Sequence, residues 1–515
     1  MDSRTISRRE TLGTLGATGM LALAGCVGGD DDGDDTGESG TTDDAEFDGL
    51  RIGVLGALTG DNGPEFGLMG ITGFLSGLAY KADDDPLTHP ALEYTEDGLT
   101  DASTVQPPEA IHGEVMEYTV GDVDMELHFR DSADNPDTAD EQAVDLVGNE
   151  NVDVLFGLSN SDSLLRVITN VVPVDDTPLF VGQATTSDAT AEADRCDRRV
   201  FRATETSAMS ARAGSAYIVD SPDIERVALY GADYSFGRSV IEQYRTALTE
   251  AGVEIVTAGD DIDEIVSQGF TDWEEKIQSE VVAADADAIV YGFTAQTGVP
   301  FFRDYASLVP ELAEPLQVIG DLPPRISTNE LGESFEVLIQ EQLGTADIDP
   351  DDLELILNLF GFGPLTARYM WNQYDNPINE TFVEMHTDAY NVVPDLFTSS
   401  AFTSASAIVQ ALDEVGEVSS DAILEGVYGM TVEETPKGEG EYEFLEANNQ
   451  ATSPITVTGL TGNIQGTERA EEHWPPIIRA GSEDELADRG DWMRIEKEQT
   501  ALRPNEVSCD LDAEF

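Results

Sequence analysis

Short apolar runs alternate along this chain with stretches whose apolar residues recur at a helical spacing. An apolar run that ends at glycine and leads into a polar turn predicts a buried strand, and the periodic stretch after it predicts a helix. The predicted strands are 50–60, 125–130, 151–157, 178–182, 199–202, 226–231, 253–258, 287–293 and 316–320, and the predicted helices are 65–80, 137–148, 161–172, 206–218, 238–251, 272–284, 379–390 and 399–417. Repeated strand–helix units predict parallel sheets covered by helices, and two such series imply two α/β lobes.

Three regions differ from this alternation. Residues 82–115 and 327–352 are polar or acidic and irregular, which indicates insertions. Residues 443–458 are typical of an antiparallel strand pair. The helix at 65–80 is rich in glycine, so we expect it to pack closely on its sheet.

The turn Ser159-Asn160-Ser161 ends one predicted strand and begins one predicted helix. In an open α/β sheet the turns at the carboxyl ends of the strands face the ligand crevice. Hydroxyls and free backbone N–H groups at a helix start suit a small anion such as a carboxylate. The alternative is that these residues simply cap the helix.

The charge balance is strongly acidic, with 26 Lys and Arg against 103 Asp and Glu and a formal net charge of -77. The acidic residues are spread along the whole chain, while 40% of residues are hydrophobic, enough for a core. Such a charge repels itself unless salt screens it, which indicates adaptation to molar salt. It also argues against nucleic acid as a partner, because nucleic acid is itself an anion.

The first 26 residues are predicted to be a targeting segment. Paired arginines in Ser7–Leu12 precede an apolar stretch too short to span a bilayer, and Leu23-Ala24-Gly25-Cys26 follows. This resembles a twin-arginine signal joined to a lipobox, in which Cys26 would carry the lipid. The alternative is a short buried helix. Residues 27–47 contain almost no core-forming side chains, which indicates a disordered tether.

The remaining two cysteines, Cys196 and Cys509, would lie outside the cell. An even pair in an oxidising compartment favours a disulfide, and two free buried thiols are the alternative.

Signatures of catalysis and of cofactor binding are missing from the sequence. It has no phosphate-binding loop, no dinucleotide turn, no Gly-x-Ser-x-Gly elbow and no Cys-x-x-Cys, and it contains only five His. We therefore expect no catalytic residues, no cofactor and no metal site. Carboxylates are so abundant that a pairing between them carries no information.

The order of the sequence motifs carries a family resemblance. It is formed by Ile52-Gly53-Val54 leading to Leu58-Thr59-Gly60, Phe129–Ser132 before Asn135-Pro136, Phe156–Ser161, Gln183–Ser187, Val200–Arg202 and Leu229–Gly237. Together they resemble the Leu/Ile/Val-type substrate-binding proteins of ABC transporters. The resemblance covers residues 50–320 well and continues more weakly to residue 458. With the acidic composition it indicates a haloarchaeal-like lipoprotein.

The resemblance implies the type I periplasmic binding protein fold, in which two Rossmann-like lobes with parallel sheets are joined by hinge crossings. The implied organisation is a signal at 1–26, a tether at 27–47, lobe 1 at 48–201 plus 365–450, lobe 2 at 202–364 plus 451–480, and an acidic tail at 481–515.

The resemblance also implies the ligand site. The serine turn that holds a ligand carboxylate falls on Ser159, Asn160 and Ser161, and the neighbouring turn falls on Ala184 and Thr185. The lid aromatics from the second lobe fall on Phe236, where a Tyr is usual, and on Phe293. The acid that meets a ligand amine falls on Asp321. Where the family often has another acid, this chain has Ser207, and Glu205 is offset, which leaves open whether the ligand is an amino acid.

The implied function is that of an exported, non-enzymatic solute-binding protein. It would be anchored by lipid to the outer face of the cytoplasmic membrane, and it would pass a small polar solute to an ABC permease and its ATPase as a monomer. The solute would be an amino acid or a related amide or carboxylate. A ligand-sensing receptor module of the same fold is the alternative, and an exported hydrolase is a further one.

Overall fold

A computed structural model describes most of the chain beyond the N-terminal segment. The described residues are 47–60, 63–95, 104–174, 176–259, 263–309, 312, 316–321, 363–394, 396–461, 479–502, 507–509 and 511. The predicted signal at 1–26 with Cys26, the tether up to residue 46 and the insertion at 327–352 lie outside these residues.

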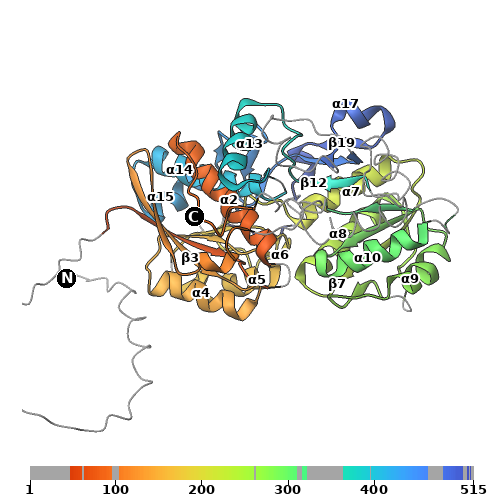
Figure 1. Ribbon diagram of the computed structural model, residues 1–515. Helices are drawn as coiled ribbons and strands as arrows, with labels where there is room; N and C mark the ends of the chain where they lie inside the picture. The colour runs from red at the N-terminus through yellow and green to blue at the C-terminus, as the bar shows by residue number, and fades with distance from the viewer. Residues whose placement is uncertain are drawn as a thin grey trace, which may run out of the picture. The chain divides into compact units, whose positions relative to one another are not determined.

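The first sheet has six strands in the order β2-β3-β1-β4-β5-β6 (Figure 1). In that order the strands span Val115–Val120, Val123–Asp131, Leu50–Gly56, Val154–Gly157, Leu179–Val181 and Val200–Phe201. All pairs are parallel except β2 with β3, and Val54 of β1 lies between Phe129 of β3 and Phe156 of β4. The predicted parallel sheet is therefore present, and β2 adds an antiparallel hairpin at its edge.

Successive side chains of β1 point to opposite faces of this sheet, as strand geometry requires. Ile52 and Val54 pack with helix α2 (Gly63–Ala82), while Leu55 packs with α4 (Pro136–Gly148) and α5 (Ser161–Asn170). Both faces are covered by helices (Figure 1), which explains why the strands are apolar throughout.

The second sheet has five strands in the path β11-β10-β7-β8, with β9 also on β7. These strands span Gln317–Ile319, Ala288–Gly292, Arg226–Ala232, Glu254–Ile255 and Ile265–Val266. Its helices are α7 (Ser207–Asp220), α8 (Ser235–Ala251), α9 (Trp273–Lys276), continued by a π-helix at Ile277–Val282, and α10 (Ala295–Leu308). Val227 and Leu229 face α7 and α8, while Ala228 and Tyr230 share the opposite core with Trp273 and Phe301. Two α/β lobes are thus present.

A third sheet joins distant parts of the chain in the order β12 (Leu365–Ala367), β16 (Ile455–Thr458) and β19 (Trp492–Ile495). Thr366 forms a parallel bridge with Asp321 after β11, and Ile455 and Ile495 lie in the core of the second lobe. Lobe 1 is predicted to resume at residue 365. In the structure β12, which begins there, pairs with β16 and lies with lobe 2 instead. Residues 481–502 are likewise part of the folded lobe, although a tail is predicted there.

The C-terminal half also completes the first lobe (Figure 1). Helices α13, α14 and α15 span Pro377–Tyr390, Thr398–Val415 and Ser420–Val427, and strands β13, β14 and β15 span Thr431–Val432, Tyr442–Phe444 and Ala451–Thr452. Helix α14 packs directly on α2, where a Cβ on Gly73 would lie 2.5 Å from the Thr398 carbonyl oxygen. The glycines of α2 therefore admit a neighbouring helix as well as the predicted sheet.

The pattern of polar and apolar residues does not predict several of these elements, among them β2, α10 and α15. The remaining short elements are the 3-10 helices Pro108–Ile111, Val172–Val174 and Ala487–Arg489, the helices α6 (Asp188–Ala191), α17 (Glu483–Leu486) and α18 (Lys497–Thr500), and the paired strands β17 (Leu460–Thr461) and β18 (Arg479–Ala480). Within the expected surface insertion 82–115, Leu92, Tyr94 and Ile111 are buried in the core of the first lobe. The described part of this insertion therefore contributes side chains to the hydrophobic core of the first lobe.

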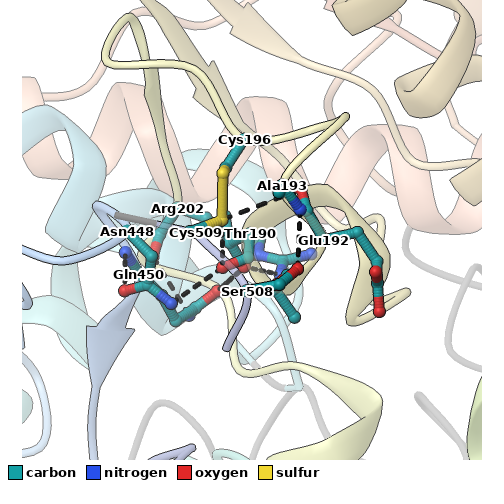
Figure 2. The surroundings of a disulfide bond; sticks show 10 residues. Thr190, Glu192, Ala193, Cys196, Arg202, Asn448, Gln450, Ser508 and Cys509 are labelled. Atoms are coloured by element: carbon teal, nitrogen blue, oxygen red, sulfur yellow. Dashed lines mark hydrogen bonds between the residues drawn. A yellow bond between two sulfur atoms is a disulfide. The ribbon is translucent and has the colours of Figure 1, made fainter. Parts of the chain in front are cut away.

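A disulfide bond joins Cys196 to Cys509, with 6.1 Å between the Cα atoms (Figure 2). The neighbouring Ser508 accepts a hydrogen bond from the Ala193 N–H and donates its own N–H to the Ala191 carbonyl. The predicted pairing is the one found in the structure, and it fastens the end of the chain to the segment that leads into β6.

Candidate functional site

The turn after β4 is tight and leads directly into α5. Gly157 has a φ of 136°, and a Cβ there would lie 2.1 Å from the Leu55 carbonyl oxygen, so only glycine fits. The Asn160 side chain accepts hydrogen bonds from the N–H groups of Asp162 and Ser163 at 2.9 and 3.1 Å. Asn160 is thus the N-cap of α5, as the alternative interpretation of this turn predicts.

Ser159 and Ser161 connect this turn to the neighbouring one. The Ser159 hydroxyl donates to the Gln183 side-chain oxygen at 3.1 Å, and Ser161 Oγ accepts from the Thr186 N–H at 3.3 Å. The turns at the ends of β4 and β5 therefore form one surface, as their positions at the carboxyl edge of a parallel sheet predict.

Two buried donors on this surface remain without a partner among the described residues. One is Gln183 Nε2, whose side chain packs so closely on α2 that a Cβ on Gly70 would lie 1.8 Å from it. The other is the hydroxyl of Thr186, a residue with no exposed surface. The adjacent Thr185 is 4% exposed, and its carbonyl accepts from the Ser207 N–H at 2.7 Å. The backbone N–H of Ala184 is already bonded to the Leu158 carbonyl. Gln183 was not among the predicted site residues, although it opens the polar turn 183–187.

The second lobe contacts this surface through the turn after β7. Ser235, at the start of α8, donates a hydrogen bond to the Asp162 carboxylate at the start of α5. Phe236 is partly buried beside Tyr234, with 5.8 Å between the ring centroids. Phe236 therefore directly follows a residue that contacts the start of α5, while its own ring packs against Tyr234 and the core of the second lobe.

Tyr234 also lies in this region, although it is not among the predicted site residues. Burial raises the pKa of its phenol well above the ordinary value, although a hydrogen bond with Thr294 lowers it in part. The carboxylates of Asp134 and Asp162 from the first lobe and of Asp321 from the second raise it further. The phenol therefore lies between the lobes in its neutral form. Its position at the end of β7 was the available signal.

Phe293 lies elsewhere, in the aromatic core of the second lobe. It is 5% exposed, and its ring centroid is 5.3 Å from that of Trp273 and 5.2 Å from that of Phe301. This packing accounts for a Phe at this position without any ligand. Among the described residues, the ring contacts of Phe293 are all with aromatic residues of the second lobe.

Asp321 is already paired with a cation. Its carboxylate is 2.8 Å from Arg368 Nη2 and accepts from the Thr366 hydroxyl at 2.6 Å. The other acid that the sequence suggests, Glu205, lies 2.5 Å from Lys437 Nζ. Both carboxylates therefore have their charge balanced within the protein, which weakens the case for either as the partner of a ligand amine.

An apolar wall adjoins these polar groups. The Phe397 ring, before α14, lies 5.8 Å from that of Phe66 in α2, and Met69 and Leu396 complete this cluster. The Arg368 guanidinium lies 5.5 Å above the Phe397 ring. Buried donors beside aromatic rings suit a small solute that has one polar and one apolar end.

No group of His, Cys, Asp and Glu side chains suited to a metal ion occurs among the described residues. In the same part of the chain, no helix combines the length and the apolar character needed to cross a membrane.

Comparisons with known proteins come from a family model and from solved structures. A model described as periplasmic binding protein matches residues 49–308 and 348–465. No curated protein matches the chain.

Three similar solved structures illustrate the structural likeness. A solute-binding protein from Rhodopseudomonas palustris BisB5 in complex with 3,4-dihydroxybenzoic acid is 16% identical, with a TM-score of 0.60, 89% of this chain covered and 100% of that chain. An amino acid ABC transporter substrate-binding protein from Pseudomonas fluorescens Pf-5 is 16% identical, with a TM-score of 0.60 and coverages of 90% and 99%. A leucine-binding protein from Thermotoga maritima MSB8 is 14% identical, with a TM-score of 0.57 and coverages of 84% and 97%. At these identities the likeness shows the fold, which is the predicted type I periplasmic binding protein fold.

Proposed function

This chain belongs to the periplasmic binding protein family, and on that premise we propose that it is the extracytoplasmic solute-binding protein of an ABC importer. It binds a small carboxylate-bearing solute between its lobes and delivers it to the permease and its ATPase. The observation that carries the proposal is the pair of buried donors that have no partner among the described residues, Gln183 Nε2 and Thr186 Oγ1, which flank Thr185 at the carboxyl ends of parallel strands. That is where ligands of open α/β sheets bind.

The state of the acidic residues narrows the solute. An amino acid needs a partner for its ammonium group, but Arg368 neutralises Asp321 and Lys437 neutralises Glu205. The Phe66–Phe397 wall offers apolar contact to the rest of the solute. A carboxylic acid without an amine fits these features better than an amino acid does. Solved relatives include complexes with 4-hydroxybenzoate and with benzoate, acids of this kind.

Replacing Thr185 by Val should weaken binding of a carboxylate about 5- to 150-fold, because the ligand oxygen loses a hydrogen-bond donor in a buried site. Valine preserves the shape of the side chain, so the fold should be unchanged. A thermal-shift screen of acids and amides at molar salt identifies a ligand, and calorimetry then gives its affinity for each variant. The matched control is Thr169→Val, because the Thr169 hydroxyl is bonded to the Leu165 carbonyl of α5. Equal affinity in the Thr185 variant and wild type would place the site elsewhere.

We also propose that lipid on Cys26 retains the protein at the membrane. The motivation is Leu23-Ala24-Gly25-Cys26 followed by a polar tether. A Cys26→Ala variant should move from the membrane fraction to the soluble fraction of fractionated cells, and Cys196→Ala is the control. A single acyl chain binds a bilayer only marginally, so firm retention requires a second chain or a protein partner. An unchanged distribution of the Cys26 variant would exclude the anchor.

Adaptation to molar salt follows from the net charge of -77. The melting temperature should fall steeply as salt is lowered from about 1 M, where the Debye length is roughly 3 Å, to about 0.01 M, where it is roughly 30 Å. Circular dichroism across a sodium chloride series measures this. Sucrose at equal osmolality is the control, because it does not screen charge. A constant melting temperature across the series contradicts the proposed adaptation.

A further inference from the structure

Three of the 26 Lys and Arg residues of this acidic protein are buried together where the two lobes join. Arg202 and Arg368 have no exposed surface, and Lys437 is 4% exposed. Arg202 follows β6 and Arg368 follows β12, so each lies in a segment that crosses between the lobes. Lys437 lies between β13 and β14.

Arg202 is held by neutral acceptors alone. Its guanidinium donates to Gln450 Oε1 at 2.6 Å and to the Thr190 hydroxyl (Figure 2). It also donates to the Thr186 carbonyl at 2.6 Å. Among the described residues it makes no salt bridge. Burial and the neighbouring Arg368 lower the pKa of Arg202 to about 9, which leaves it charged at neutral pH. The Asp188 carboxylate interacts with Arg202 electrostatically. Burial raises the pKa of Asp188, although Arg202 opposes that shift.

Arg368 has one unused donor. Its Nη2 is bonded to Asp321 and its Nη1 to the Glu205 carbonyl, but its buried Nε has no partner among the described residues. The Asp321 side chain is 21% exposed, so this ion pair reaches solvent. The Phe397 ring against the guanidinium belongs to the apolar wall described above.

Direct ion pairs compensate only two of these three cations. Arg368 pairs with Asp321 and Lys437 with Glu205, whereas Arg202 has no salt bridge among the described residues and interacts with the Asp188 carboxylate without one. A buried charge without a directly paired counter-ion is unfavourable, and an anion that binds beside it relieves that cost. Resting on the proposed function, we propose that Arg202 and Arg368 make this site selective for an anionic solute over a neutral solute of the same shape.

A chain of hydrogen bonds connects Arg202 to the candidate site. Arg202 donates to the Thr186 carbonyl, and the Thr186 N–H donates to Ser161 Oγ in the turn after β4. Hydrogen bonds in series polarise one another in a low-dielectric interior. Arg202 therefore acts through the turn at 184–187, as a positioning residue, while Arg368 offers Nε to the solute itself.

The test uses the full-length protein at molar salt and two pairs of isosteric probes, benzoate with benzamide and 4-methylpentanoate with 4-methylpentanamide. Calorimetry gives the ratio of acid to amide affinity for wild type, Arg368→Gln, Arg202→Gln and the charge-conserving Arg368→Lys. The control is Arg166→Gln on α5, which removes the same charge from a half-exposed pair with Asp137. Each Gln variant should lower the ratio of acid to amide affinity about tenfold or more, because it weakens binding of the acid and leaves binding of the amide unchanged. Loss of a hydrogen bond to a charged group has an effect of this size. Arg368→Lys and Arg166→Gln should keep the wild-type ratio.

Three results overturn the inference while the proposed function stands. The first is equal affinity of the wild-type protein for acid and amide. This result does not depend on whether any variant folds. The second is a Gln variant that loses acid and amide in the same proportion, since this marks a purely structural role. The third is an unchanged ratio in both Gln variants. If neither pair binds wild type and no other carboxylate in the thermal-shift screen does, the proposed function itself fails.

Discussion

Replacing Glu205 by Gln is expected to lower the free energy of unfolding by about 3–5 kcal/mol, because the Lys437 ammonium would be left buried without a counter-ion. Glu205 is 1% exposed, and one of its oxygens accepts from Lys437 Nζ at 2.5 Å, from Ser453 Oγ at 2.5 Å and from the Tyr442 hydroxyl at 3.0 Å. Its own carbonyl accepts from Arg368. Three segments that pass between the lobes therefore meet at this residue, so the effect should be large.

Chemical denaturation at molar salt measures the effect, and Glu205→Gln with Lys437→Met completes a double-mutant cycle. The double variant should be markedly more stable than the sum of the two losses predicts, because removal of both charges leaves neither one unpaired. The control is Asp137→Asn, which breaks the exposed pair with Arg166 at 2.7 Å and should cost no more than about 1 kcal/mol. A loss of this small size at Glu205 would mean that the buried pair is dispensable.

The same pair gives a dependence of stability on pH. Burial alone would raise the pKa of Glu205, but the Lys437 ammonium and the hydrogen bonds from Lys437 and Ser453 outweigh it and hold this pKa below its usual value. The contribution to stability is therefore complete above the ordinary Glu pKa of about 4.3 and is lost as the pH falls through the lower pKa of the folded state. The Glu205→Gln variant should lack this acid-dependent component of the unfolding free energy.

Removing the disulfide is expected to lower the free energy of unfolding by about 2–5 kcal/mol, because the unfolded chain gains the freedom of a long loop. The bond joins residues that are 313 positions apart, and it lies next to Thr190, which holds Arg202 (Figure 2). Denaturation of the Cys196→Ser, Cys509→Ser double variant, and of wild type with and without reductant, measures the contribution. Reductant should have no effect on the double variant, which is the matched control.

Ser508→Ala separates the disulfide from its surroundings. This variant keeps the bond and removes only the Ser508 hydroxyl, which accepts from the Ala193 N–H at 2.8 Å, so it should cost about 1 kcal/mol. If wild type unfolds at the same denaturant concentration with and without reductant, the C-terminal segment is held by its other contacts and the disulfide contributes nothing measurable.

The sequence by itself determined most strands and helices of the two α/β lobes, although not β2, α10 or α15, and it indicated the region of the candidate site. Buried parallel strands must be apolar on both faces, so the runs at β1, β4, β7 and β10 are readable without any structure. Parallel strands also end at a common edge, so the turns that carry Ser159 and Thr185 can be predicted to lie together from their order alone. Both predictions depend on local patterns.

Only the tertiary structure decided which charges and rings the site can offer a ligand. Asp321 is paired with Arg368, 47 residues away, and Glu205 with Lys437, 232 residues away. In a chain with 103 acidic residues, nothing in the sequence marks which of them will meet a cation. Phe293 likewise has the position of a lid residue in sequence and the contacts of a core residue in space. Pairing and packing between distant segments depend on how the chain brings them together, and the local pattern of polar and apolar residues does not contain that information.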